Sequence, residues 1–220
     1  MVVVVTYFVS KNNITDIAKV KDTFSENNRF GLNDISEQTD KYIIKAYIPY
    51  TNIPVLDEKL KNEISDIVSN FKKDTENLKI INNDKKFELN VCFNNYEFDN
   101  YVSFLVFYTY DLGGAHPNKN CITINYNKKE NTFVTIDTLI SKDNNVLNKL
   151  SNYCFDDLRN KVIFNEKEDI LKQVLFPEKK NFEKFVFSKE GIIIFFPSYS
   201  LMPYYMGEFE VIISYDMIAI

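Results

Sequence analysis

The only histidine of the chain, His116, lies in the segment Tyr-Thr-Tyr-Asp-Leu-Gly-Gly-Ala-His-Pro-Asn at residues 108–118. Imidazole titrates near neutral pH, so His116 is suited to general acid or base chemistry. Asp111 could orient its ring, and Ser103 or a tyrosine could act with it. However, the sequence holds no nucleophile elbow, and spacing alone does not bring a nucleophile, a base and an orienting group together. We therefore expect no catalytic residues and a structural or binding role for His116.

Two of the five glycines, Gly113 and Gly114, precede His116 by a few residues. A glycine pair permits positive φ and close backbone approach, which a sharp exit from a β-strand requires. In one interpretation His116 pins this turn by hydrogen bonds, and both glycines are indispensable for the backbone shape. In the other, the turn is a binding surface formed by Tyr110, Gly113, Gly114, His116, Pro117 and Asn118.

A second candidate surface lies in the segment Ser-Tyr-Ser-Leu-Met-Pro-Tyr-Tyr-Met at residues 198–206. Tyrosine and methionine in a proline-containing loop favour an interaction surface, because tyrosine contributes a large contact area at low entropic cost. They also suit stacking against sugar rings. The alternative is that these rings only close the end of a sheet. The candidate binding residues here are Tyr199, Pro203, Tyr204 and Tyr205.

Composition limits the chemistry that these segments can perform. The chain has 220 residues, of which 45% are hydrophobic and 26% charged, as in a globular protein. One histidine is too few for histidine-based metal centres, so we expect no metal site and no cofactor. A net charge of −5 with only Arg29 and Arg159 as arginines argues against nucleic acid as the ligand.

The cysteines and the apolar segments indicate in which cellular compartment the protein works. Cys92, Cys121 and Cys154 are odd in number and lie in apolar patterns, so we expect buried free thiols, with a reactive thiol or one disulfide as alternatives. No apolar run is long enough to span a bilayer, and residues 1–9 are typical of a β-strand rather than a signal peptide. These features predict a cytoplasmic protein, or an extracytoplasmic one if the sequence is a piece of a longer precursor.

The remaining pattern predicts an α+β fold, with antiparallel sheets, two main amphipathic helices packed on them and two linked lobes. One helix begins at Pro54 and buries Leu56, Leu60, Ile64, Ile67 and Phe71; the other begins near Asn145. A short turn is expected to begin at Asp137 or Thr138, and the charged residues 166–181 are expected to hold a short helix before Pro177. Strands are expected at 1–9, 41–50, 87–98, 101–112, 121–126, 131–136, 185–187, 191–196 and 209–215. The predicted division is an N-terminal strand and polar segment at 1–40, one lobe at 41–130 and a second at 131–220.

The segment at 108–118 resembles the Tyr-x-Gly-Gly-Ala-His motif of the RsiV/PdaC-type domain family. That family includes the extracytoplasmic region of lysozyme-binding anti-sigma factors and the N-terminal region of peptidoglycan deacetylases. A second resemblance lies at residues 195–207, where Pro197-Ser198-Tyr199 and Pro203-Tyr204-Tyr205-Met206-Gly207 are similar to the family's Tyr-x-Ile-Ala-Pro-Tyr-Ala-Ala-Gly signature. Further similarity lies in Ile48-Pro49-Tyr50, Asn125-Tyr126 and Thr135-Ile136-Asp137-Thr138-Leu139-Ile140.

The resemblance implies a non-enzymatic binding or sensor-type domain that recognises a lysozyme-like protein or a peptidoglycan fragment. The anti-sigma segment, membrane helix and deacetylase domain of those relatives have no counterpart in this sequence, so sigma-factor regulation and deacetylation do not transfer. The alternatives are a small hydrolase or transferase that uses His116, or a cytoplasmic paralogue with an unrelated ligand. The oligomeric state is left open.

Overall fold

The computed structural model describes residues 30–79, 85–161 and 168–218. Within these residues, six strands form one large mixed sheet in sequence order. All neighbours in this sheet are antiparallel except β2 and β3, which are parallel and are connected by helix α2. The strands are β1 (Gly31–Gln38), β2 (Tyr42–Tyr50), β3 (Phe87–Phe98), β4 (Tyr101–Asp111), β5 (Asn118–Asn127) and β6 (Thr132–Phe133).

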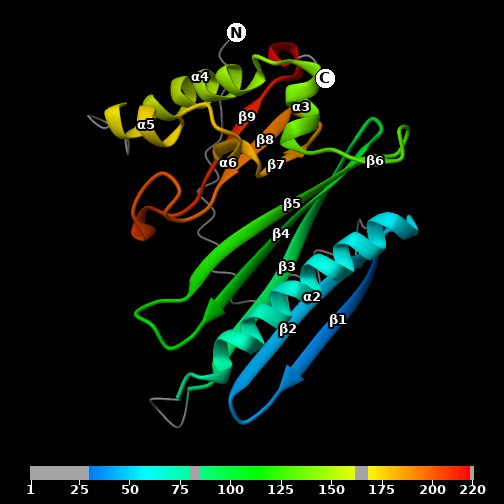
Figure 1. The fold of residues 1–220 in the computed structure, drawn as a ribbon, viewed down its shortest axis with the longest axis vertical. Helices are drawn as coiled ribbons and strands as arrows, with labels where there is room; N and C mark the ends of the chain where they lie inside the picture. Colours follow the sequence, from blue (N-terminus) through cyan, green and yellow to red (C-terminus); the bar gives the residue numbers. More distant parts are fainter. Residues whose placement is uncertain (1–29, 80–84, 162–167, 219–220) are drawn as a thin grey trace.

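Helix α2 (Pro54–Glu76) covers one face of the large sheet (Figure 1). Its first residue is proline, whose missing N–H would have no helical partner at that position. Its buried side is Leu56, Leu60, Ile64, Val68, Phe71 and Thr75. The predicted helix is confirmed, although Val68 is buried more completely than Ile67. Every second residue of β4 faces this helix and joins the same core: Val102, Phe104 and Val106.

A second, three-stranded antiparallel sheet has the order β7–β8–β9, with four helices on one of its faces (Figure 1). Its strands are β7 (Phe185–Phe187), β8 (Ile192–Phe196) and β9 (Phe209–Ile213), and the helices are α3 (Ile136–Lys142), α4 (Val146–Arg159), α5 (Glu168–Val174) and α6 (Lys179–Phe182). Short 3-10 turns lie at η2 (Tyr204–Met206) and η3 (Tyr215–Met217). Helix α4 buries Val146, Leu150, Cys154 and Leu158 against this sheet. The predicted α+β class is therefore confirmed.

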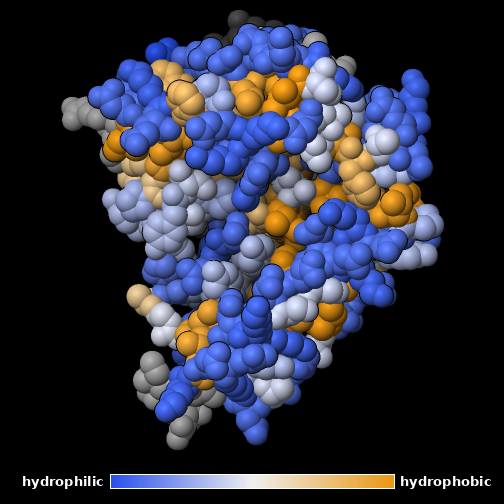
Figure 2. All heavy atoms as spheres, in the orientation of Figure 1, coloured by the Kyte–Doolittle hydropathy of each residue, from blue (hydrophilic) through white to orange (hydrophobic). Residues whose placement is uncertain are grey.

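The two sheets meet on the face of β4 and β5 that lies opposite α2. A small apolar cluster of Leu105, Cys121, Val186 and Ile193 fills the junction. Beside it, the β7 backbone bonds to side chains of the large sheet: the Phe187 N–H donates to Ser103 Oγ at 3.1 Å, and Asn125 Nδ2 donates to the Phe185 carbonyl at 2.9 Å. Both faces of β4 are therefore covered, one by α2 and the other by the small sheet. Figure 2 shows apolar side chains along the seam between the two parts.

Four features of the large sheet and its continuation differ from the expectation. Strand β1 was not predicted, because its sequence Gly-Leu-Asn-Asp-Ile-Ser-Glu-Gln is polar and mostly exposed. It is held by pairing with β2 and by Glu37, which accepts hydrogen bonds from Tyr42 and Lys72 at 2.5 Å each. The β2–α2–β3 unit is one parallel crossover, where the sequence predicted none. Helix α3 replaces an expected turn, and β6 is shorter than the predicted strand at 131–136.

The expected strand at residues 1–9 lies outside the described residues, and the division into segments at residues 40 and 130 stays a prediction. The three cysteines are free thiols, as expected; Cys121 and Cys154 are buried, whereas Cys92 is only partly buried. Burial raises the pKa of Cys92 to about 11 and that of Cys121 to about 12, so neither is poised as a thiolate. No helix among the described residues is long and apolar enough to cross a membrane.

Candidate functional site

Two loops that are far apart in the sequence meet through the rings of His116, Tyr199 and Tyr204, which we call the aromatic cluster. The Tyr199 hydroxyl lies 3.0 Å from Nε2 of His116. The Tyr204 ring stacks on the imidazole, with 3.8 Å between ring centroids and 8° between planes. The ring centroids of Tyr199 and Tyr204 are 5.5 Å apart. The two segments singled out from sequence therefore form one surface.

The turn that carries His116 leaves β4 through Asp111 and Gly113. Gly113 has φ of +80°, a conformation that residues with a side chain rarely adopt. Its N–H donates to Asp111 Oδ1 at 2.8 Å, and Lys85 Nζ lies 2.8 Å from the other oxygen of that carboxylate. Gly114 has no positive φ and its added Cβ would meet only the His116 carbonyl at 3.9 Å. The expectation that both glycines are indispensable is thus wrong for Gly114.

Asp111 is the charged group that stabilises this turn. Burial opposes its ionisation, but the hydrogen bonds from Lys85 and from the Gly113 backbone outweigh burial and hold the pKa of Asp111 below its ordinary value. Asp111 is therefore an anion at neutral pH. Its two oxygens bond to Lys85 and Gly113, which gives this carboxylate a structural role rather than that of an orienting group for His116.

The loop between β8 and β9 presents the tyrosines. Leu201 and Met202 are buried in the core of the small sheet and fix the middle of the loop. Tyr199 has φ of +70°, which is uncommon for a bulky residue and is typical of functional loops. Pro203 precedes η2, and Gly207 with φ of +85° follows it. As a result, Tyr199 is 59% exposed and Tyr205 is 82% exposed.

Both ring nitrogens of His116 have partners, since Nδ1 lies 3.1 Å from the Pro117 carbonyl and Nε2 contacts Tyr199. Ser103, considered from sequence as a possible partner, is fully buried at the junction of the sheets and accepts the Phe187 N–H. It does not contact His116. Among the described residues, no group of three or more histidine, cysteine, aspartate or glutamate side chains could hold a metal ion.

The other predicted residues fall into two groups. Pro117 and Asn118 are exposed beside His116, and Pro203 is exposed in the facing loop. Tyr110 is different: it stacks with Tyr108 and packs against the core under α2, so its inclusion in the binding surface finds no support. Figure 2 shows residues of intermediate hydropathy over the β8–β9 loop, at the left edge of the molecule.

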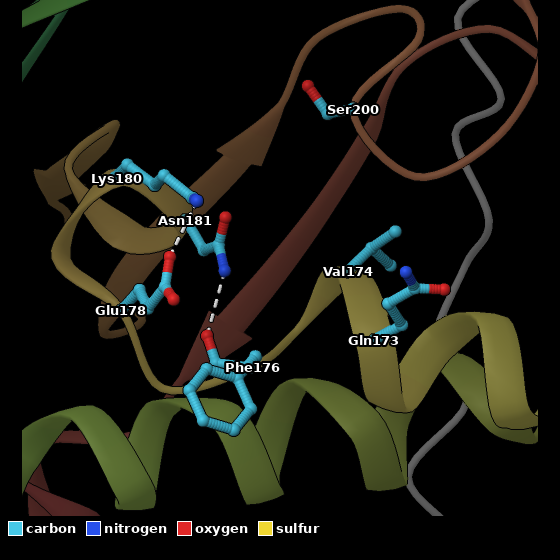
Figure 3. A pocket seen from close by; sticks show the side chains of 7 residues that line it. All are labelled: Gln173, Val174, Phe176, Glu178, Lys180, Asn181 and Ser200. Carbon is cyan, nitrogen blue, oxygen red and sulfur yellow. Dashed lines mark hydrogen bonds and ion pairs between the residues drawn. The ribbon is translucent and has the colours of Figure 1, made fainter.

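A hollow of about 380 Å³ lies on the other side of the same loop (Figure 3). Its walls are the end of α5, the link from α5 to α6, the start of α6, and Ser200, which directly follows Tyr199. The ring of Phe176 lines it and is 57% exposed. Asn181 Nδ2 donates to the Phe176 carbonyl at 2.8 Å, and Lys180 pairs with Glu178 at 2.6 Å.

Sequence reasoning missed this hollow, because residues 166–181 were interpreted only as a charged segment with a short helix. That helix is confirmed as α5. The available signal was Phe176-Pro177, a large aromatic residue followed by a helix-breaking proline within the charged segment. Because the chain turns at Pro177, the Phe176 ring stays exposed and forms part of the wall of the hollow.

Comparison with known proteins gives a consistent relationship. Residues 137–216 match the family described as "Protein of unknown function (DUF3298)". The peptidoglycan-N-acetylmuramic acid deacetylase PdaC of Bacillus subtilis (strain 168) is 27% identical over 180 residues. The match covers 79% of this chain but only 38% of PdaC, so the chain spans well under half of that relative.

Two crystal structures share the fold. A DUF3298 family protein from Pseudomonas aeruginosa PAO1 has a TM-score of 0.60 at 12% identity, over 86% of this chain and 93% of its own. A DUF3298 family member from Bacteroides fragilis has a TM-score of 0.54 at 16% identity, over 86% of this chain and 92% of its own. At these identities the likeness concerns the fold alone.

Proposed function

The chain carries a DUF3298 domain and is a distant homologue of the N-terminal region of PdaC, and from this premise we propose that it is a non-enzymatic binding domain for cell-wall glycan. The single observation that supports the proposal most strongly is the aromatic cluster. Two separate loops converge so that His116 and Tyr204 stack while Tyr199 stays largely exposed. Such convergence is expected of a recognition surface, since loops positioned by a rigid scaffold commonly carry binding residues.

The chemistry of the cluster suits a sugar. Aromatic rings offer an apolar face to the C–H groups of a sugar, while phenol and imidazole groups at their edges can hydrogen-bond its hydroxyls. Tyr205 extends this surface by a further ring that is almost fully exposed. The name of PdaC refers to a peptidoglycan substrate, which supports the same class of ligand for a domain shared with it. On this proposal the domain works outside the cytoplasm.

A calorimetric titration with soluble peptidoglycan fragments tests the proposal. We expect binding by the wild-type chain and about fivefold weaker binding by Tyr199→Ala and Tyr205→Ala, because stacking by one exposed ring contributes roughly 1 kcal/mol. The matched control is Tyr50→Ala, an exposed tyrosine of β2 outside the cluster, which should bind as the wild type does. The proposal fails if the wild-type chain binds no fragment, or if all three variants bind equally well.

A lysozyme-like protein is the second candidate ligand. The observation that favours it is the net charge of −5, which would accelerate the encounter with a basic protein. The same titration with lysozyme distinguishes the two ligands. Binding of lysozyme that weakens steeply with salt, together with no binding of glycan fragments, would favour the protein ligand over the glycan.

A hydrolase or transferase reaction at His116 has less support than binding. Pro117 and Tyr199 occupy both ring nitrogens, and Asp111 bonds to Lys85 and Gly113 instead. Glycan fragments incubated with the chain should therefore be recovered intact, as judged by mass spectrometry. Turnover that His116→Ala abolishes would replace the binding proposal with the catalytic one.

A further inference from the structure

The hollow beside α5 and α6 shares a loop with the aromatic cluster. Tyr199 contacts His116 on one side of that loop, and its neighbour Ser200 lines the hollow on the other. Consecutive residues are only about 3.8 Å apart along the backbone, so the two features are adjacent parts of one surface. A chain-like ligand that passes over this loop would contact both features.

The hollow has the size and the mixed lining of a small-molecule subsite. Its volume of about 380 Å³ lies at the lower end of the usual range for ligand sites, which suits one sugar unit. Val174 and the exposed ring of Phe176 supply apolar surface, and Gln173, Asn181 and Ser200 supply amide and hydroxyl groups. Figure 3 shows these side chains on opposite walls, with Phe176 below Asn181.

An acetamido group fits this lining. It combines a methyl group with one N–H donor and one C=O acceptor, so it needs an apolar contact next to amide groups. Asn181 uses its Nδ2 on the Phe176 carbonyl, an arrangement that fixes the side chain and turns its Oδ1 to be an acceptor for a ligand N–H. The side-chain amide of Gln173 and the hydroxyl of Ser200 can serve the C=O and a sugar hydroxyl.

The charges beside the hollow favour a neutral sugar. Lys180 and Glu178 are both well exposed and pair with each other at 2.6 Å, which largely cancels the field that either would exert alone. A carboxylate on the ligand would have to compete with Glu178 for Lys180. The lining is therefore better matched to an uncharged N-acetylated unit than to an anionic one.

We propose that the hollow is a subsite for a neutral N-acetylated amino sugar, next to the units of the same strand that contact the aromatic cluster. The inference rests on the proposed glycan-binding function and names its ligand class. N-acetylglucosamine alone is the first probe, at about 50 mM because a single small subsite binds in the millimolar range. Nitrogen-15 NMR of the full chain should show shifts of the Gln173 and Asn181 side-chain amides.

Phe176→Ala should abolish these shifts, while Tyr50→Ala, an exposed tyrosine of β2 outside both the aromatic cluster and the hollow, should leave them intact. Gln173→Ala is a second variant at an exposed position. In this variant the shift of the Asn181 side-chain amide reports whether N-acetylglucosamine still binds. In calorimetry with a six-unit N-acetylglucosamine oligomer, we expect Phe176→Ala to bind about tenfold more weakly than the wild type. Glu178→Gln should raise the affinity for N-acetylmuramic acid several-fold by freeing Lys180, with little effect on N-acetylglucosamine.

The outcomes separate the two proposals. If the wild type binds the oligomer but Phe176→Ala binds it equally well and the amides do not shift, the subsite is overturned and the glycan function stands. If the wild type binds neither the oligomer nor peptidoglycan fragments, the glycan function fails and the subsite fails with it. Preference of the wild type for N-acetylmuramic acid would overturn the assignment of a neutral sugar.

Discussion

The hydroxyl of Tyr199 lies 3.0 Å from Nε2 of His116, and this contact joins positions that are 83 residues apart. His116 lies in the loop that follows β4 of the large sheet, and Tyr199 lies in the loop that follows β8 of the small sheet. The surface that we assign to ligand binding therefore exists only when the two sheets are correctly placed against each other.

Tyr199→Phe should loosen the tyrosine loop with little effect on global stability. The variant keeps the ring but loses the hydroxyl, and a hydrogen bond at a half-exposed site is worth about 1 kcal/mol or less. Amide hydrogen exchange at residues 198–206 should become faster, while the urea midpoint changes little. Tyr205→Phe is the control, and equal acceleration in both variants would contradict a specific role for the Tyr199–His116 contact.

Gly113→Ala should be destabilising and Gly114→Ala close to neutral. The added Cβ at Gly113 would meet nothing closer than a Phe87 ring carbon at 3.7 Å, so the cost comes from its φ of +80° rather than from a clash. A left-handed conformation costs about 1–2 kcal/mol for a residue with Cβ. Urea unfolding of the two variants measures the difference, and equal losses would show that the turn needs both glycines.

Ser103→Ala should weaken the junction between the two sheets. The side chain is fully buried, and its loss leaves the Phe187 N–H without an acceptor, at a cost of about 1–3 kcal/mol. Ser141→Ala, which removes an exposed hydrogen bond to the Thr138 carbonyl on α3, should cost less than about 0.5 kcal/mol. Thermal unfolding of both variants tests this, and a neutral Ser103→Ala would show that apolar contacts alone hold the junction.

The ion pair of Asp111 with Lys85 predicts a pH dependence. Because the pKa of folded Asp111 is lower than the ordinary 3.8, its contribution is fully present above that value and is lost as the pH falls through the lowered pKa. Asp111→Asn should therefore melt at a lower temperature than the wild type at pH 6. The gap should close as the pH falls through the lowered pKa of Asp111. A gap that does not depend on pH would assign the effect to packing instead of charge.

The local elements with strong periodic signals could be predicted from sequence. The β3–β4 hairpin was predicted almost to the residue, because Asp99 and Asn100 separate two apolar runs and Asp99 adopts the left-handed conformation that such a turn uses. Helices α2 and α4 were predicted from their apolar stripes. These signals are local, so neighbouring residues alone determine them.

Strand β1 and the parallel pairing of β2 with β3 depend on partners elsewhere in the chain. The sequence of β1 has little strand propensity, and its pairing with β2 and the bond from Lys72 to Glu37 hold it in place. Each half of the aromatic cluster could be identified from sequence. One half has a glycine pair next to the single histidine, and the other has several tyrosines in a proline-containing loop. Their contact across 83 residues and the hollow beside them could not, because no spacing rule relates separate loops.

Each sheet has its own apolar core, and each contributes one of the two loops that meet at His116 and Tyr199. The exposed residues of 112–117 and 197–208 can therefore vary in sequence while Gly113, the buried Leu201 and Met202, and the core beneath them stay the same. This is the logic of antibody combining sites, in which hypervariable loops diversify on a constant framework. The fold is accordingly a scaffold on which libraries of the two loops could be selected for new ligands.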